Sequence, residues 1–255
     1  MSPRVAVTVL HRFRGAAVAG TLAGVLTVAG TVVPAGDGRA ALPDPRPGGA
    51  PLLSRTWAPG HDPADPTVLV NKTHPVTPAD WSPDDLVRPD VASLGEHDLL
   101  QADAARALER LAADAEAATG HELVLASGYR SADYQRRLYA RYVDAHGRRA
   151  ADAFSARPGY SEHQTGLAAD VAEAGTPYTE FGRTRTGRWV ATQAWRHGFV
   201  VRYPEGRQAV TGYAPEPWHL RYVGTGLTVP MRLAGTTTLE EAFGVDPAPD
   251  YASAR

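Results

Sequence analysis

The stretch Ser161-Glu-His-Gln-Thr-Gly-Leu-Ala-Ala-Asp-Val171 joins a polar segment to a short apolar one. Its second half, from Leu167 to Val171, has the composition of a short buried strand. Gly166 stands just before that strand and permits a tight turn, because glycine adopts backbone angles that are closed to other residues. The stretch therefore predicts a strand that carries Asp170, with His163 held next to it across the turn.

Helices and further short strands are predicted on both sides of this stretch. Leu100, Leu108 and Leu111 recur at helical spacing, and Gly120 is a typical helix stop. The predicted helices cover residues 98–119, 132–145 and 188–197, and the other predicted strands cover 67–71, 121–127, 199–203 and 218–223. Helices and strands do not alternate regularly, as they would in a doubly wound fold. We therefore expect an α+β fold.

The first 66 residues differ in composition from the rest. Arginines precede an uncharged stretch over residues 15–33, which is the pattern of a secretory signal within residues 1–40. A helix of that length spans about 28 Å, close to a bilayer core, so a retained membrane anchor is the alternative. Glycines inside the run favour cleavage. The Pro- and Gly-rich residues 41–66 predict a disordered linker. We expect an exported domain over 67–245, extracellular or associated with the cell wall, and a short tail over 246–255.

Composition excludes several classes of chemistry. The chain has no cysteine, which rules out disulfides, thiolate metal sites and cysteine nucleophiles. It contains no G-x-S-x-G motif, and no serine lies three residues before Lys72, the single lysine. The net charge of −2 gives no reason to expect nucleic acid as a partner. Histidine, carboxylate, arginine and tyrosine side chains remain for catalysis, with or without a metal.

Two of the nine histidines stand in unusually polar surroundings. His163 lies in the stretch quoted above, and His219 ends the run Glu216-Pro-Trp-His. Together with Asp170 they would form a two-histidine, one-carboxylate set, which suits a catalytic zinc with one position open for water. Glu216 would then be placed to act as the base. Each spacing alone is common among surface residues, so the spacing leaves the metal site as one hypothesis beside a structural role.

Three runs in a fixed order give a more specific signal. They are Ser127-Gly-Tyr-Arg-Ser131, Ser161-Glu-His-Gln-Thr-Gly-Leu-Ala-Ala-Asp170 and Glu216-Pro-Trp-His-Leu-Arg-Tyr-Val-Gly224. These runs resemble the motifs of the VanY-type D-alanyl-D-alanine carboxypeptidases, the zinc peptidases of bacterial cell walls. Further matching pieces are Val70-Asn-Lys72, Gly198-Phe-Val-Val-Arg-Tyr-Pro204 and Thr211-Gly-Tyr213. The resemblance covers residues 67–245.

The resemblance implies a fold, a cofactor and a set of roles. The fold would be a small, mostly antiparallel sheet flanked by helices, as in Hedgehog and D,D-peptidase domains. One catalytic Zn²⁺ would be held by His163, Asp170 and His219, with Glu216 as the catalytic acid and base. Arg130 would hold the C-terminal carboxylate of the substrate, a task that suits a planar guanidinium. Further residues expected to line the substrate pocket are Gln135, Ser161 and Tyr203.

The activity implied by the resemblance is removal of the C-terminal D-alanine from peptidoglycan stem peptides. An L,D-carboxypeptidase that trims tetrapeptide stems would use similar residues. Endopeptidase activity on cross-linked wall also stays open, because loops decide whether the end of a substrate pocket is open or closed. A non-catalytic zinc module that binds the cell wall is an alternative of another class. Its expected sign is loss of the base or of the carboxylate-binding arginine, and Glu216 and Arg130 are both present.

Overall fold

A computed structural model describes residues 57–251, and the structural statements below concern these residues. The predicted signal segment and most of the predicted linker lie outside them. The α-helices are α1 (Ala102–Thr119), α2 (Ala132–His146), α3 (Arg148–Ala151), α4 (Arg185–Gln193), α5 (Gln208–Thr211), α6 (Thr225–Ala234) and α7 (Leu239–Phe243). The strands are β1 (Leu86–Val87), β2 (Leu100–Gln101), β3 (Leu123–Ser127), β4 (Ala168–Glu173), β5 (Phe199–Tyr203) and β6 (Glu216–Tyr222). Short 3₁₀ helices are η1 (Glu162–Thr165), η2 (Tyr178–Arg183) and η3 (Ala194–His197).

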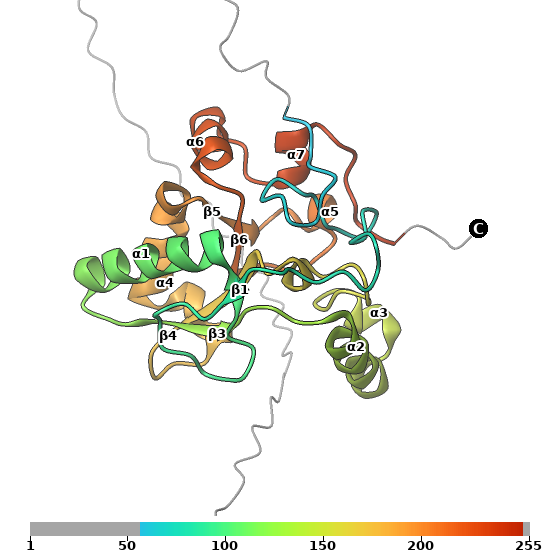
Figure 1. Ribbon diagram of the computed structural model, residues 1–255, viewed down its shortest axis with the longest axis horizontal. Helices are drawn as coiled ribbons and strands as arrows, with labels where there is room; N and C mark the ends of the chain where they lie inside the picture. Colours follow the sequence, from blue (N-terminus) through green and yellow to red (C-terminus); the bar gives the residue numbers. More distant parts are fainter. Residues whose placement is uncertain (1–56, 252–255) are drawn as a thin grey trace, which may run out of the picture. The chain divides into compact units, whose positions relative to one another are not determined.

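A four-stranded antiparallel sheet lies at the centre of the molecule (Figure 1). Its strand order is β3-β4-β6-β5, and β1 and β2 form a separate antiparallel pair. In the central pair of strands Asp170 lies directly opposite His219. The architecture confirms the predicted α+β fold with a small antiparallel sheet flanked by helices.

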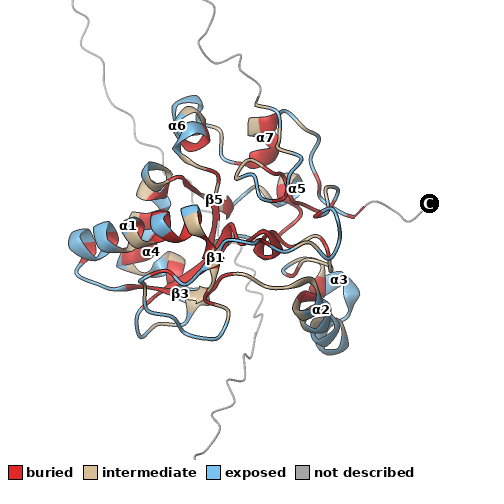
Figure 2. Ribbon diagram, in the orientation of Figure 1, coloured by how far each residue is buried: buried red, intermediate tan, exposed pale blue. Residues whose placement is uncertain are grey.

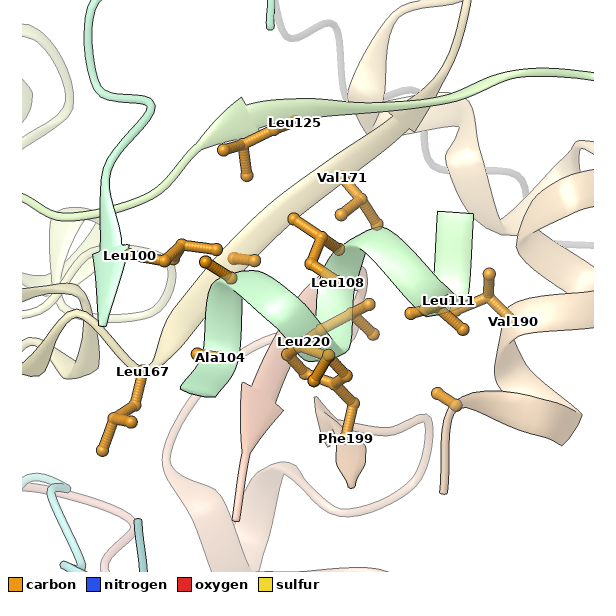
Figure 3. Close-up of a cluster of buried hydrophobic side chains, with 14 of the residues drawn as sticks. Leu100, Ala104, Leu108, Leu111, Leu125, Leu167, Val171, Val190, Phe199 and Leu220 are labelled. Carbon is orange, nitrogen blue, oxygen red and sulfur yellow. The ribbon is translucent and has the colours of Figure 1, made fainter. Parts of the chain in front are cut away.

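One face of the sheet packs against α1 (Figure 3). The helix presents Ala104, Leu108 and Leu111 on one side, because these positions recur with helical spacing. They meet Val171 and Leu220 from the strands, and all of these side chains are buried. The helix ends at Gly120 in the left-handed conformation. This layer is the main hydrophobic core.

The opposite face of the sheet is covered as well. A second apolar cluster joins the chain after β6 to the two C-terminal helices α6 and α7; its members are Leu69, Val223, Leu227, Met231, Leu239 and Phe243. Partly buried Val200 of β5 packs against this cluster. Every residue of β4 is buried, whereas Figure 2 shows the outer sides of α1 and α2 as exposed. The sheet is therefore enclosed on both sides, and polar residues on it are withdrawn from water.

Three predicted elements differ from the observed ones by more than one or two residues at an end. Residues 67–71 form no regular strand, because Val68 and Asn71 make only isolated bridges. The helix predicted over 98–119 begins at Ala102, since the two residues before it pair with β1. The helix predicted over 188–197 starts earlier, at Arg185 after a threonine cap, and its last turn is the 3₁₀ helix η3.

Packing extends beyond the predicted limits 67–245 of the domain. Ala248 is buried, and the Tyr251 hydroxyl accepts a hydrogen bond from the Arg157 backbone N–H at 2.8 Å. Lys72 is also buried, and it donates to the Pro249 carbonyl at 3.4 Å. These contacts fix the C-terminal segment, as far as residue 251, on the body of the domain. Among the described helices, none has the length and apolar character needed to cross a bilayer.

Candidate metal centre

Three buried side chains converge at the polar face of the sheet. His163 lies in η1, Asp170 in β4 and His219 in β6. One ligand atom of each lies within 4.8 Å of the others. The turn after η1 is made by Gly166, whose φ of 70° and close neighbours disfavour any side chain. This confirms the predicted turn between His163 and the strand of Asp170.

The Asp170 carboxylate lies between the two histidines. Its Oδ2 is 3.2 Å from His163 Nε2, and its Oδ1 is 3.0 Å from His219 Nδ1. The other ring nitrogen of each histidine has a separate partner. His163 Nδ1 lies 2.7 Å from the Gly128 carbonyl, and His219 Nε2 lies 3.2 Å from Glu162 Oε2. Both rings are thus held with one nitrogen turned toward Asp170.

The surroundings shift the pKa values of the three groups in different directions. Burial lowers the pKa of His163 to about 4, and the nearby Arg130 charge acts in the same sense. Burial also acts to lower the pKa of His219, but hydrogen bonds to Asp170 and Glu162 raise it to about 9. Although burial opposes it, the charges of His163 and Arg130 hold the pKa of Asp170 well below its usual range. The carboxylates therefore favour a positive charge here, either a proton or a metal cation.

Glu216 and Arg130 border this set. Glu216 begins β6, and its Oε2 lies 3.8 Å from His219 Nδ1. Burial raises the pKa of Glu216 to about 8. Arg130 donates to Asp170 Oδ2 at 2.6 Å and to Ser127 Oγ at 2.9 Å. Its side chain keeps 18% of its surface exposed, so this cation is reachable from solvent.

The loop that carries Arg130 is fixed by its neighbour Gly128. A Cβ on Gly128 would lie 2.3 Å from the Leu99 carbonyl oxygen, so no larger residue fits without a shift of the backbone. The Gly128 carbonyl is the acceptor for His163. One short loop thus orients both His163 and Arg130.

The predicted pocket-lining residues divide into two groups. Tyr203 lies opposite Glu216 in the β5–β6 register, and its ring centre is 4.9 Å from that of His219. Ser161 is buried directly before η1. Gln135 instead donates to the Ala156 carbonyl at 2.7 Å, and its buried Oε1 has no hydrogen-bond partner among the described residues. The structure brings Tyr203 to the metal centre, whereas the hydrogen bond of Gln135 goes to the loop around Ala156.

A buried ionic network behind His219 was missed in the sequence analysis. Glu162 bonds to Arg202 and Arg221 as well as to His219, and Arg202 bonds to Glu240. All four of these charged side chains are fully buried. The sequence does place an arginine after the apolar residues of each strand, Arg202 in β5 and Arg221 in β6. In a strand with one solvated face these positions would carry surface charges, so the pattern by itself indicates exposure.

The donor set fits a catalytic metal. Two imidazoles and one carboxylate at this separation are the ligands that zinc takes in hydrolytic sites, where a fourth position remains for water. In each histidine the ring nitrogen that faces away from Asp170 already has a hydrogen-bond partner, which is typical of metal-binding histidines. A carboxyl group with a raised pKa lies beside the set. Fold and site together therefore define a metal centre of the metallohydrolase class.

Comparison with known proteins places the chain within that class. The family described as VanY, D-alanyl-D-alanine carboxypeptidase, matches residues 97–225. A relative from Bacillus subtilis, the putative carboxypeptidase YodJ, is 39% identical over 189 residues, which are 71% of this chain and 68% of the relative. The chain belongs to the VanY family of carboxypeptidases.

Two solved structures show the same fold. The LD-carboxypeptidase LdcB, described for its recognition of peptidoglycan, has 38% identity and a TM-score of 0.67, covering 72% of this chain and 88% of its own. A vancomycin-resistance D,D-pentapeptidase VanY in complex with Zn(II) has 31% identity and a TM-score of 0.58, covering 69% of this chain and 97% of its own. Similar proteins thus include carboxypeptidases named for both L,D and D,D bonds.

Proposed function

We propose that the protein is a zinc-dependent D,D-carboxypeptidase that removes the C-terminal D-alanine from peptidoglycan stem peptides. The observation that carries the proposal is the buried set of His163, Asp170 and His219 with Glu216 at its edge. The family match and the zinc-bound relative support it. The three residues of the set would hold one Zn²⁺. When bound, zinc lowers the pKa of a coordinated water and polarises a carbonyl oxygen.

Glu216 supplies the proton chemistry in this proposal. Its carboxyl group lies 3.8 Å from a ligand histidine, and burial raises its pKa to about 8. A carboxyl group with a pKa near neutrality can accept a proton from the attacking water and return it to the departing amine. Because water itself attacks the peptide bond, the reaction needs no covalent nucleophile from the protein, which agrees with the lack of cysteine.

Arg130 binds the free carboxylate at the end of the substrate. It is a partly exposed cation directly beside Asp170, held at its Nε by Ser127. A guanidinium offers two parallel donors to a carboxylate. The enzyme would therefore cut next to a free C-terminus. The presence of both Arg130 and Glu216 argues against a module that only binds the wall.

The deciding experiment is release of D-alanine by the purified protein from a muramyl pentapeptide and from the corresponding tetrapeptide. We expect release from the pentapeptide with zinc, none with a chelator, and a loss of about 10²- to 10⁴-fold in kcat for Glu216→Gln. Glu205→Gln is the matched control, because Glu205 is exposed. Full turnover by Glu216→Gln would refute the assigned role.

An L,D-carboxypeptidase is the second candidate, favoured by the likeness to LdcB. Release of D-alanine from the tetrapeptide alone would establish that specificity with the same residues. Cleavage of cross-linked dimers alone would indicate an endopeptidase. If neither stem nor dimer is cut while zinc stays bound, the wall-binding module becomes the better reading.

We also propose that residues 1–40 direct export. The support is the basic start and the uncharged stretch over residues 15–33. N-terminal sequencing of the protein recovered from the producing cells distinguishes a start near residue 36 or 41 from an intact, membrane-retained chain. Intact chain in the cytoplasm would contradict the proposal.

A further inference from the structure

The two ligand histidines are oriented by different outer partners. His163 Nδ1 faces the Gly128 carbonyl, which can only accept a hydrogen bond, so the proton is on Nδ1 and the lone pair is on Nε2. His219 is turned the other way: its Nε2 faces Glu162 Oε2, and its Nδ1 faces Asp170. The ring of His219 thus contacts the carboxylate of Glu162, whereas the outer partner of His163 is a backbone carbonyl.

We propose that Glu162 is a positioning residue for His219, keeping the ring proton on Nε2 so that the Nδ1 lone pair is directed at the zinc ion. The inference rests on the zinc chemistry proposed above. Partners of this kind fix the tautomer and ring orientation of a ligand histidine and raise its basicity. Glu162 precedes the ligand His163 in the chain, so the same 3₁₀ turn would both supply one ligand and orient the other.

The geometry reserves one oxygen of Glu162 for this task. Its Oε1 accepts from Arg202 Nε at 2.8 Å and from Arg221 Nη1 at 3.0 Å. Its Oε2 is left to His219 at 3.2 Å. The Glu162 side chain is fully buried, so no solvent water replaces any of these partners. Two guanidiniums therefore hold the carboxylate ionised and fix its rotation.

The same network contains a matched carboxylate that does not touch the metal centre. Glu240 is fully buried and accepts from two nitrogens of Arg202, at 2.7 and 3.0 Å. Asn71 also donates to Glu240 Oε1, at 3.0 Å. Glu162 and Glu240 thus share Arg202, burial and charge, but Glu162 alone contacts Arg221 and His219. A structural role alone would make their replacements equivalent.

The glutamine variant of Glu162 tests the tautomer directly. Arg202 and Arg221 donate, so they hold the amide oxygen, and the amide NH₂ is left facing His219 Nε2. That nitrogen must then accept, which moves the ring proton to Nδ1, the atom that faces Asp170. We expect Glu162→Gln to weaken zinc binding about 10- to 100-fold. Glu240→Gln lowers the stability of the fold but leaves zinc affinity unchanged.

Zinc affinity is measured on the full chain by competition with a chromophoric chelator, and stability by thermal unfolding of the metal-free protein. Unchanged zinc affinity in Glu162→Gln, or an equal loss in Glu240→Gln, overturns the inference. Failure of the unsubstituted protein to bind zinc overturns the proposed function as well, so the two failures are distinguishable.

Nitrogen NMR of the unsubstituted, zinc-loaded protein with labelled histidine gives a second test that depends on no variant. We expect His219 to show a protonated Nε2 and a metal-bound Nδ1. A proton on Nδ1, or zinc on Nε2, would show that Glu162 does not have this role. The spectrum keeps the inference testable even where Glu162→Gln fails to fold.

Discussion

The two faces of the central sheet use adjacent residues for opposite purposes. Val171 and Leu220 point into the layer beneath α1, while their chain neighbours Asp170 and His219 meet at the metal centre. Exposure does not separate the two faces, since Asp170 and His219 are only 6% and 4% exposed. One face is stable because it is apolar. The other must be stabilised by pairing each buried charge, since an unpaired charge away from water is costly.

This difference between the two faces shows when an alternating strand pattern predicts burial correctly. Alternation of apolar and polar residues predicts a buried face and a solvated one. Here the face with the charges is enclosed by the segments after β6, so its polar residues become a metal centre and an ionic network. Breaking either face should therefore lower stability, but only changes at the metal centre and its direct contacts should also alter zinc binding or turnover.

The largest effect is expected for Arg202→Ala. The variant removes a guanidinium bonded to two buried carboxylates, Glu162 and Glu240. Removal of one partner of a buried ionic pair costs about 3–5 kcal/mol, since the remaining charge is left uncompensated. Chemical denaturation of the metal-free protein measures this loss. Arg232→Ala, at an exposed position on α6, is the control and should leave the unfolding free energy unchanged. Equal stability of the two variants would show that the network contributes little.

Arg130→Ala should have a smaller effect than Arg202→Ala, and we expect it in the free energy of transition-state binding, measured as kcat/KM. A hydrogen bond to a charged group contributes about 1.5–3 kcal/mol, so kcat/KM should fall about 100-fold for a substrate with a free carboxylate. Arg137→Ala, exposed on α2, is the control. Unchanged kcat/KM in Arg130→Ala would refute the assigned contact with the substrate.

The apolar face and the convergence of His163, Asp170 and His219 could be predicted from the sequence, for different reasons. Apolar spacing predicted α1, and the strand over 199–203 has the predicted limits. The prediction that these three residues lie together followed from three linked motifs, because spacing alone left it ambiguous. The ionic network could not be predicted in this way. Arg202 and Arg221 occupy positions where alternation indicates solvent, and their burial depends on segments far away in the chain, such as α7 with Glu240.

The irregular segments were the other source of error. Residues 67–71 have the composition of a strand, yet the Pro66 and Val68 carbonyls accept hydrogen bonds from Arg221 instead of from a neighbouring strand. The helix predicted from residue 98 begins later, since Leu100 and Gln101 pair with β1. In both cases a tertiary contact overrides the local preference.

The apolar face can be weakened without touching the chemistry. Val171→Ala removes two buried methyl groups next to Asp170 in the chain, and at about 0.8 kcal/mol per buried carbon plus a small cavity it should cost about 2 kcal/mol. Zinc affinity and kcat/KM should stay the same below the unfolding temperature. Val229→Ala is the control, since Val229 is 37% exposed on α6. A fall in zinc affinity with Val171→Ala would mean that the two faces are coupled through β4.

The smallest effect tests how far the polar site extends along the chain. Ser131 follows Arg130 and caps α2, where its side chain accepts from the Tyr134 backbone N–H at 3.2 Å. Loss of such a cap costs about 1 kcal/mol, so Ser131→Ala should lower the unfolding free energy by that amount. Catalysis should be unaffected, because Arg130 is held by Ser127 and Asp170 and not by the cap. Ser131→Asp should restore the stability, since aspartate caps equally well. A drop in kcat/KM that accompanies the loss of the cap in Ser131→Ala and recovers in Ser131→Asp would show that α2 itself positions the arginine, and the boundary of the site would then include the helix.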